Sequence, residues 1–199
     1  MALNPVYEPD DDSFLLWNVF LKELHNLMDD NHKTLKTFVS EKSFLDMGAG
    51  SGYLGFEAGK LGFKNVVFSD INPESISQIN SVIESEDFNF VVRESDLFSN
   101  VEGFFDFILF NTPYLPNEKS EELNDLALNG GSIGNEVAIS FLKQLKNHLS
   151  KNGFSLLLTS SLSRPEDFVG QAKSLGFECV LVGSKKLFFE ELLVYKLTL

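Results

Sequence analysis

The stretch from Phe105 to Tyr114 (FDFILFNTPY) constrains the fold more than any other part of the sequence. It is a nearly continuous apolar run that stops abruptly at a polar amide, Asn111. Such a run is typical of a strand that is buried on both faces of a parallel sheet. Ligands of open α/β sheets bind beyond the carboxyl ends of the strands, so we expect Asn111 to project into a binding crevice.

The end of this stretch is the first candidate for chemistry. Pro113 restricts Thr112 to extended backbone and fixes its own φ, so the Asn111 side chain and the Thr112 carbonyl would lie on one rigid arc. Two hydrogen-bond acceptors on such an arc can hold a planar NH2 group. An Asn-x-Pro turn that merely closes a buried strand is the alternative.

Strands and helices alternate along most of the chain. The predicted strands are 43–47, 65–70, 88–92, 105–110 and 154–159, and the predicted helices are 53–61, 72–83, 137–149 and 164–175. This alternation produces a parallel sheet with helices on both faces. Gly153 is expected to end the third of these helices. Residues 178–182 and 192–197 are predicted to form a final antiparallel hairpin, with Lys185 and Lys186 in the link between them.

An amphipathic helix is predicted over residues 14–28, after three aspartates whose carboxylates favour a helix N-terminus. A metal site is the alternative for these aspartates, but consecutive helix residues point in different directions. The polar stretch 29–42 is predicted to be a connection. We expect residues 1–40 to form a helical segment that packs on the core of a single domain spanning 1–199. The long polar stretch 116–129 is predicted to be a functional loop.

The first predicted strand runs into a glycine loop, residues 48–52 (GAGSG), which precedes a helix. Glycines are needed where a ligand touches the backbone, because a Cβ would occupy the space. Asp70 and Asp96 follow the next two strands. Asp70 is suited to accept hydrogen bonds from two ribose hydroxyls, and Asp96 from an adenine amino group beside Leu97. The alternatives are a tight turn without ligand for the loop and helix caps for the acids.

The same glycines also fit a second cofactor. Gly50, Gly52 and Gly55 satisfy the pattern G-x-G-x-x-G, so an NAD-dependent oxidoreductase stays open as an interpretation. Read from Gly48, directly after the strand, the third position of that pattern falls on Tyr53. With Tyr53 in place of the third glycine, this alignment of the pattern disfavours a dinucleotide-binding site.

Composition limits the remaining function classes. Sixteen Lys and Arg against 29 Asp and Glu give a net charge of −13, which disfavours a long nucleic-acid footprint but not a single flipped base. The single cysteine, Cys179, permits no internal disulfide and fits a reducing compartment. The three histidines show no zinc or triad pattern, so no metal is predicted. Without an apolar run of ~18 residues, a cytoplasmic protein with no membrane partner is expected.

Taken together, these motifs resemble the class I S-adenosylmethionine-dependent methyltransferases. Residues 111–114 resemble the Asn-Pro-Pro-Tyr motif of that superfamily. Tyr7-Glu8-Pro9, residues 12–15 (DSFL), Gly130-Gly131 with Gly134 and the final hairpin extend the resemblance over nearly the whole chain, to the short branch of the HemK-like protein glutamine methyltransferases. The fold that the resemblance implies is a Rossmann-like, seven-stranded, mostly parallel sheet with helices on both faces and a C-terminal antiparallel hairpin.

The resemblance implies an activity and a cofactor. That family methylates the side-chain amide nitrogen of glutamine in the Gly-Gly-Gln motif of class I translation release factors, with S-adenosyl-L-methionine as methyl donor. By position, the residues assigned to the cofactor are Tyr7, Pro9, Ser13, Asp46, Gly48, Gly50, Asp70, Ile71, Asp96, Leu97 and Asn111. Those assigned to catalysis are Asn111, Thr112, Pro113 and Tyr114. Adenine-N6 methylation of nucleic acid is the alternative, because the same motif serves exocyclic amines.

Thr112 departs from the family pattern, which has proline at this position. The threonine keeps the backbone carbonyl that is needed as an acceptor but is expected to leave the loop less rigid. In this interpretation, Asn111 and the Thr112 carbonyl accept both amide hydrogens and hold the nitrogen in line with the methyl group.

A partner is also implied, because short-branch members of the family work with a small zinc-binding activator subunit that adds to the sheet edge. The chain holds 20 phenylalanines, and five of them gather around the third and fourth strands: Phe88, Phe90, Phe98, Phe104 and Phe105. We expect some of these to lie exposed at an interface near the third strand. The alternative is that all of them belong to the core.

Overall fold

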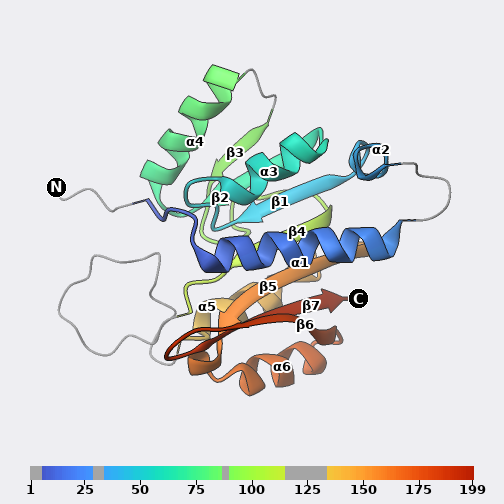
Figure 1. Ribbon diagram of the computed structural model, residues 1–199, viewed down its shortest axis with the longest axis vertical. Coiled ribbons are helices and arrows are strands. Elements are labelled where there is room, and N and C mark those ends of the chain that lie inside the picture. Colours follow the sequence, from blue (N-terminus) through green and yellow to red (C-terminus); the bar gives the residue numbers. More distant parts are fainter. Residues whose placement is uncertain (1–5, 29–33, 87–89, 115–133) are drawn as a thin grey trace.

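The computed structural model describes residues 6–28, 34–86, 90–114 and 134–199. In this part of the chain seven strands form one sheet in the order β3-β2-β1-β4-β5-β7-β6 (Figure 1). The strands are β1 (Ser43–Met47), β2 (Asn65–Asp70), β3 (Val91–Glu94), β4 (Phe105–Asn111), β5 (Leu149–Ser160), β6 (Glu178–Lys186) and β7 (Glu191–Thr198). The first five are parallel, and β7 runs antiparallel to both β5 and β6. The predicted mostly parallel sheet with a terminal hairpin is confirmed.

Helices cover both faces of this sheet (Figure 1). The helices are α1 (Asp11–Leu27), α2 (Leu35–Val39), α3 (Tyr53–Leu61), α4 (Pro73–Glu86), α5 (Glu136–Leu145) and α6 (Pro165–Ser174). Apolar side chains of α1, α2, α3 and α4 join one buried cluster, and those of α5 and α6 join a second. Successive strand residues point to opposite faces, so Phe44 of β1 lies in the first cluster and Leu45 in the second.

Helix α1 packs across the sheet through a stripe at helical spacing. Leu16, Phe20 and Leu24 are fully buried. The ring of Phe20 contacts those of Phe44 and Phe107 at centroid distances of 5.4 and 5.5 Å. Burial of one such side chain contributes about 2–3 kcal/mol. The N-terminal segment therefore belongs to the same core as the sheet, which fixes the start of α1 at the carboxyl edge.

Four local predictions were wrong. The third strand, predicted at 88–92, is Val91–Glu94, and residues 87–89 lie outside the described part. Because β3 lies at the edge of the sheet, its last residues, Arg93 and Glu94, can be polar and exposed. The end of the apolar run at Val92 therefore does not mark the end of the strand. The stretch 29–42 contains α2, which begins with a capping box between Thr34 and Thr37. Strand β6 extends through Lys186, so the two hairpin lysines lie in the strand and not in the link.

The fourth error concerns Leu149 and Gly153, which were assigned to a helix and its end but belong to β5. A Cβ on Gly153 would lie 2.3 Å from the carbonyl oxygen of Asp106. The ladder between β4 and β5 shifts register near this point, between Phe105 and Phe107. The glycine therefore permits close approach of two backbones inside a sheet, not the end of a helix.

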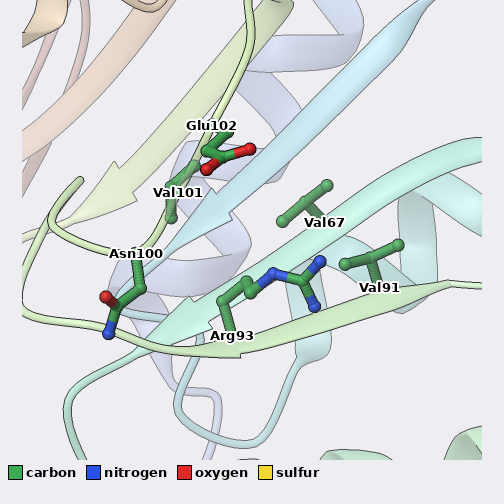
Figure 2. Close-up of a pocket in the computed structure, with 6 residues that line it drawn as sticks. All are labelled: Val67, Val91, Arg93, Asn100, Val101 and Glu102. Atoms are coloured by element: carbon green, nitrogen blue, oxygen red, sulfur yellow. The ribbon is translucent and has the colours of Figure 1, made fainter.

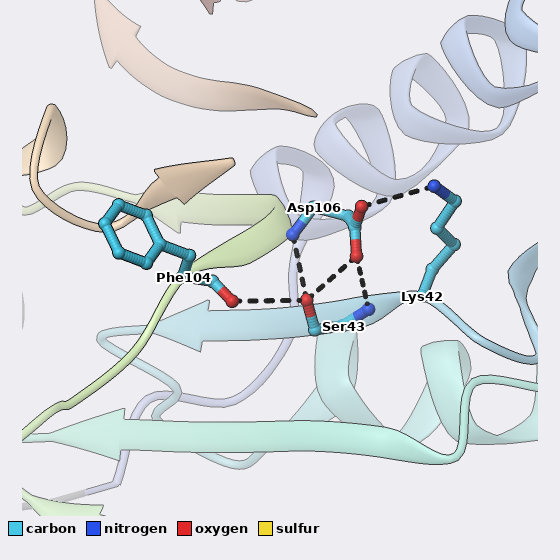
Figure 3. Close-up of polar contacts among 4 residues, drawn as sticks. All are labelled: Lys42, Ser43, Phe104 and Asp106. Carbon is cyan, nitrogen blue, oxygen red and sulfur yellow. Dashed lines mark hydrogen bonds and ion pairs between the residues drawn. The ribbon is translucent and has the colours of Figure 1, made fainter. Parts of the chain in front are cut away.

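The amino ends of β1 and β4 are joined by a polar cluster (Figure 3). The Asp106 carboxylate accepts hydrogen bonds from the Ser43 N–H at 2.9 Å and from the Ser43 hydroxyl at 3.0 Å. Lys42 Nζ lies 3.3 Å from the same carboxylate. These contacts support the register that places Met47 opposite Phe110. That register sets Asn111 beside the glycine loop at the other end of the two strands.

The phenylalanines expected to crowd the third and fourth strands are divided. Phe98 and Phe105 are buried, Phe104 is 64% exposed, and Phe88 lies outside the described residues. The largest exposed fractions among the large hydrophobic side chains of the described part belong to Phe188 and Phe189, after β6. Among the described helices, none is long and apolar enough to span a membrane.

Candidate active site

The glycine loop after β1 requires glycine at three positions. Gly48, Gly50 and Gly52 have φ values of 62°, 54° and 81°, in the left-handed region that side chains with a Cβ disfavour. A Cβ on Gly48 would lie 3.0 Å from the Phe110 ring and 4.0 Å from the carbonyl oxygen of Asn111. The loop is thus packed against the end of β4, where the candidate motif begins.

One strand-end acid, Asp70, holds this loop, and another, Asp46, holds the helix that follows it. Asp70 accepts hydrogen bonds from the Gly50 N–H at 2.7 Å and from the Asn72 N–H at 2.8 Å, and burial raises the pKa of its carboxyl. Asp46 is 1% exposed and accepts from the Gly55 N–H at 2.8 Å. Burial raises the pKa of Asp46 well above its usual value. Asp46 therefore supports the start of α3 beneath the loop, whereas Asp70 lies at the loop itself.

The third acid, Asp96, is exposed and follows Ser95, whose backbone is bonded to Asp70. The Ser95 N–H donates to the Asp70 carbonyl at 2.8 Å, which fixes the turn after β3 against the end of β2. Leu97 is half-buried with a φ of 48°, and its carbonyl accepts from the Ser95 hydroxyl at 2.9 Å. Ile71 is 52% exposed directly after Asp70. Two apolar side chains therefore accompany the two acids at this edge.

The N-terminal segment lies over the glycine loop. The Ser51 N–H donates to the Tyr7 carbonyl at 3.2 Å, and a Cβ on Gly50 would lie 3.2 Å from the same oxygen. Pro9 follows, half-buried, before α1 begins. Tyr7 and the loop are more than 40 residues apart in the chain, so only the tertiary structure brings them together.

Asp12 joins the N-terminal segment to the motif, and sequence reasoning assigned it only to a helix start. The side chain is buried, and its Oδ2 accepts from the Tyr7 hydroxyl at 2.7 Å and the Tyr114 hydroxyl at 3.3 Å. Its Oδ1 accepts from the Ser13 N–H at 2.5 Å. Burial, together with the Asp12 charge, raises the pKa of both tyrosines. No local signal marks this role, because Tyr114 is 102 residues away.

Asn111 presents an acceptor that lacks a donor. Its Nδ2 lies 3.5 Å from the Ser13 hydroxyl oxygen, at the long limit for a hydrogen bond. Its Oδ1 is buried and accepts no hydrogen bond from the described residues. Leaving a buried acceptor unpaired costs about 1–3 kcal/mol. The unpaired oxygen is therefore suited to a hydrogen-bond donor that a ligand brings.

Thr112 is anchored to the neighbouring strand by two hydrogen bonds. Its N–H and its hydroxyl both donate to the Leu158 carbonyl, at 3.3 and 2.8 Å. A proline at this position offers neither donor. The threonine therefore restrains the motif by a tertiary contact where the family pattern uses a ring. Pro113 and Tyr114 follow, both half-buried.

The structure gathers the predicted residues at the carboxyl edge of β1, β2 and β4. Within the described residues, no group of three or more His, Cys, Asp or Glu side chains is arranged to hold a metal ion. The predicted loop 116–129 and the pair Gly130-Gly131 lie outside the described residues.

This strand order, with a glycine loop after β1, an acid after β2 and a polar motif after β4, defines the class I methyltransferase fold. The chain belongs to the methyltransferase small domain family, whose sequence profile matches residues 24–169. It is 37% identical over 198 residues to the "Putative protein N5-glutamine methyltransferase" of Methanocaldococcus jannaschii, covering 98% of this chain and 92% of the relative. The ribosomal protein L11 methyltransferase of Thermotoga maritima is 28% identical over 141 residues, 70% of this chain and 45% of the relative. The chain thus spans about half the length of that second relative.

Solved structures share the fold at lower identity. The Mtq2–Trm112 complex of E. cuniculi, described as responsible for methylation of the eRF1 translation termination factor, matches with a TM-score of 0.71 and 21% identity, covering 97% of this chain and 98% of that one. The T. thermophilus 16S rRNA N2 G1207 methyltransferase, in complex with AdoMet and guanosine, matches with a TM-score of 0.64 and 17% identity over 96% of this chain and 44% of that one. The chain is a methyltransferase, and the NAD-dependent oxidoreductase interpretation is set aside.

Proposed function

We propose that this protein transfers a methyl group from S-adenosyl-L-methionine to the side-chain amide nitrogen of glutamine, in the Gly-Gly-Gln motif of a class I translation release factor. The near-full-length relative carries the name of a protein N5-glutamine methyltransferase. The observation that supports this acceptor most directly is the buried, unpaired Oδ1 of Asn111 at the end of β4.

The residues at the carboxyl edge fit the cofactor. The glycine loop takes left-handed turns at Gly48 and Gly50, which bring its backbone against the Asp70 carboxylate. Asp70 still has lone pairs for ribose hydroxyls beyond the backbone N–H groups of Gly50, Ile71 and Asn72 that it already accepts. Asp96, beside Leu97, is suited to an adenine amino group. S-adenosylmethionine, when bound, supplies an electrophilic methyl group.

The residues of this chain have to orient the glutamine amide nitrogen, which is a poor nucleophile. Asn111 Oδ1 would accept one amide hydrogen and the Thr112 carbonyl the other, which directs the nitrogen lone pair along one line. The Ser13 hydroxyl beside Nδ2 and the Leu158 carbonyl beneath Thr112 hold these two acceptors in place. Positioning of this kind supplies several kcal/mol of the barrier reduction.

The test is a competition between acceptors. The enzyme is incubated with labelled cofactor, the release factor of the same organism, the release factor with Gln→Asn in its Gly-Gly-Gln motif, and DNA. Label on the wild-type release factor alone, assigned to methylglutamine by mass spectrometry, is expected. Label in the DNA alone would refute the proposal in favour of adenine-N6 methylation.

The variant Asn111→Ala separates binding from transfer. Removing one preorganised acceptor should lower the transfer rate about 100-fold or more, while the cofactor Kd changes little. Calorimetric titration gives the cofactor Kd, and label transfer at saturating substrate gives the rate. Equal losses in both would assign Asn111 to the cofactor instead.

We also propose that a small activator subunit covers the β3 edge of the sheet. Beside this edge lies a hollow of about 430 Å³, lined by Val67, Val91, Arg93 and residues 100–102 (Figure 2). The connection from β3 to β4 contains no helix, so this part of the sheet face has no helix of its own above it. An exposed edge strand offers unpaired backbone groups to a partner strand. The Mtq2 neighbour is described in a complex with Trm112, which supports a partner of this kind.

A further inference from the structure

The turn between β6 and β7 presents two phenylalanines to solvent. Phe188 is 91% exposed and Phe189 is 85% exposed. Their rings contact each other edge to face, with centroids 4.6 Å apart, and Leu187 beside them packs against the core. The two rings therefore stand together beside a half-buried leucine that joins them to the core.

Turn chemistry does not explain this pair. The Leu187 N–H donates to the Glu190 carbonyl at 2.8 Å, so Phe188 and Phe189 occupy the two central positions of a tight turn. Glycine, asparagine, aspartate and proline favour such positions, and each phenylalanine leaves a large apolar area in water. Exposed apolar surface of this kind marks an interaction site.

The turn lies at the same sheet edge as the candidate active site. The Ser160 hydroxyl at the end of β5 donates to Glu190, and the Glu191 N–H donates to the Ser161 hydroxyl at 2.9 Å. Two residues earlier on β5, the Leu158 carbonyl holds Thr112. Strands are spaced about 4.8 Å apart, so β7 stands roughly 10 Å from the motif strand β4. The aromatic pair is therefore within reach of a polypeptide whose glutamine lies at Asn111.

Charge at this edge selects the kind of partner. Lys185 Nζ lies 2.7 Å from the Asp11 carboxylate, and Lys186 stands opposite Glu191 in the ladder. Asp10 and Glu190, which both lie near Tyr114, add further acids at the same edge, and these repel phosphates and attract basic side chains. A polypeptide with basic residues fits this surface, and a nucleic acid does not.

We propose that Phe188 and Phe189 form a docking site for an apolar side chain of the protein substrate, in a basic segment beside its target glutamine. This inference rests on the proposed function and adds to it the surface that selects a folded protein. The pair contributes to affinity for the substrate and not to the transfer step.

The test uses the full-length protein with its activator subunit if that is required for activity. The variant Phe188→Ser/Phe189→Ser is compared with Leu27→Ser, which removes a 40% exposed apolar side chain at the far end of α1, away from both the active site and the β3 edge. The double variant should raise KM for the release factor about tenfold or more, since aromatic anchors dominate interfaces. The transfer rate at saturation, the cofactor Kd and the melting temperature should stay unchanged, and Leu27→Ser should match the wild type. The wild-type KM should also rise as salt is added.

The outcomes separate the two proposals. Wild-type enzyme that methylates no release factor refutes the proposed function, whatever the variants do. Wild-type activity with an unchanged KM in the double variant refutes the docking site alone, as does an equal rise in KM for Leu27→Ser. A KM that is independent of salt refutes the basic character of the segment. A wild-type dimer in light scattering that the double variant abolishes would assign the pair to self-association and overturn the proposal.

Discussion

At the scale of single residues, Asp12 couples the two halves of the candidate site. Its carboxylate accepts a hydrogen bond from the hydroxyl of Tyr7, which lies over the glycine loop, and another from the hydroxyl of Tyr114, which ends the motif. A buried carboxylate that accepts charge-assisted hydrogen bonds fixes its donors more strongly than a neutral acceptor. Asp12 is therefore a positioning residue that sets the motif relative to the cofactor loop.

Asp12→Ala is expected to lower the transfer rate about 10- to 100-fold through misplacement of the motif, with the two tyrosines left without their acceptor. Unfolding should become easier by about 1–3 kcal/mol. The matched control is Asp11→Ala, since Asp11 is half-exposed and its ion pair with Lys185 is worth about 0–1 kcal/mol. Steady-state kinetics and urea unfolding give both quantities. A double variant with Tyr114→Phe whose fold-loss in rate is the product of the two single fold-losses would contradict the coupling.

The raised pKa of Asp46 predicts that the free energy of unfolding depends on pH. Because burial raises its pKa in the folded state, the folded protein retains a proton at pH values where the unfolded chain has released it. The free energy of unfolding therefore falls as pH rises from the ordinary value near 3.8 to the raised folded pKa. Asp46→Asn keeps an acceptor for the Gly55 N–H but does not titrate. As pH rises through this range, the free energy of unfolding of Asp46→Asn, measured in urea, should increase relative to that of the wild type. If the free energies of both proteins depend on pH in the same way, the assignment is contradicted.

At the scale of elements, the contact between β4 and β5 depends on a glycine. Gly153→Ala would place a Cβ 2.3 Å from the Asp106 carbonyl and is expected to destabilise the fold by about 1–3 kcal/mol. Gly170→Ala is the matched control, because Gly170 lies in α6 with nothing within 4 Å of its added Cβ. It should stabilise the protein by about 0.5–1 kcal/mol. Thermal unfolding of the two variants measures the contrast, and equal melting temperatures would contradict it.

At the scale of the whole molecule, the sheet has two edge strands with different expected roles. We predict that Val91→Arg on β3 abolishes stabilisation by the activator subunit, because a charge is inserted at the proposed interface. Val180→Arg on β6 is the control, since Val91 and Val180 are similarly exposed, at 38% and 44%. Co-expression followed by light scattering and activity assays measures the effect. Wild-type protein that is monomeric, soluble and fully active without any added subunit would rule out the partner.

The sequence by itself determined the order of the seven strands and of every described α-helix except α2. It also determined the glycine loop and the acids at the strand ends. Apolar periodicity and strand-end residues are local patterns, so they can be read in a window of a few residues. The run from Phe105 to Phe110 is buried or nearly so along its length because both faces of β4 are covered. The resemblance to glutamine methyltransferases also depended on short motifs in chain order.

The tertiary structure alone decided how distant side chains pair. Asp12 meets Tyr114 across 102 residues, and the Asn111 oxygen is unpaired only because of what surrounds it. Gly153 shows the same limit, since a glycine that allows two strands to approach has the same local signature as one that ends a helix. Among the described phenylalanines, the two most exposed lie after β6, whereas Phe98 and Phe105 near β3 and β4 are buried. Burial depends on which elements cover a residue and not on its own type.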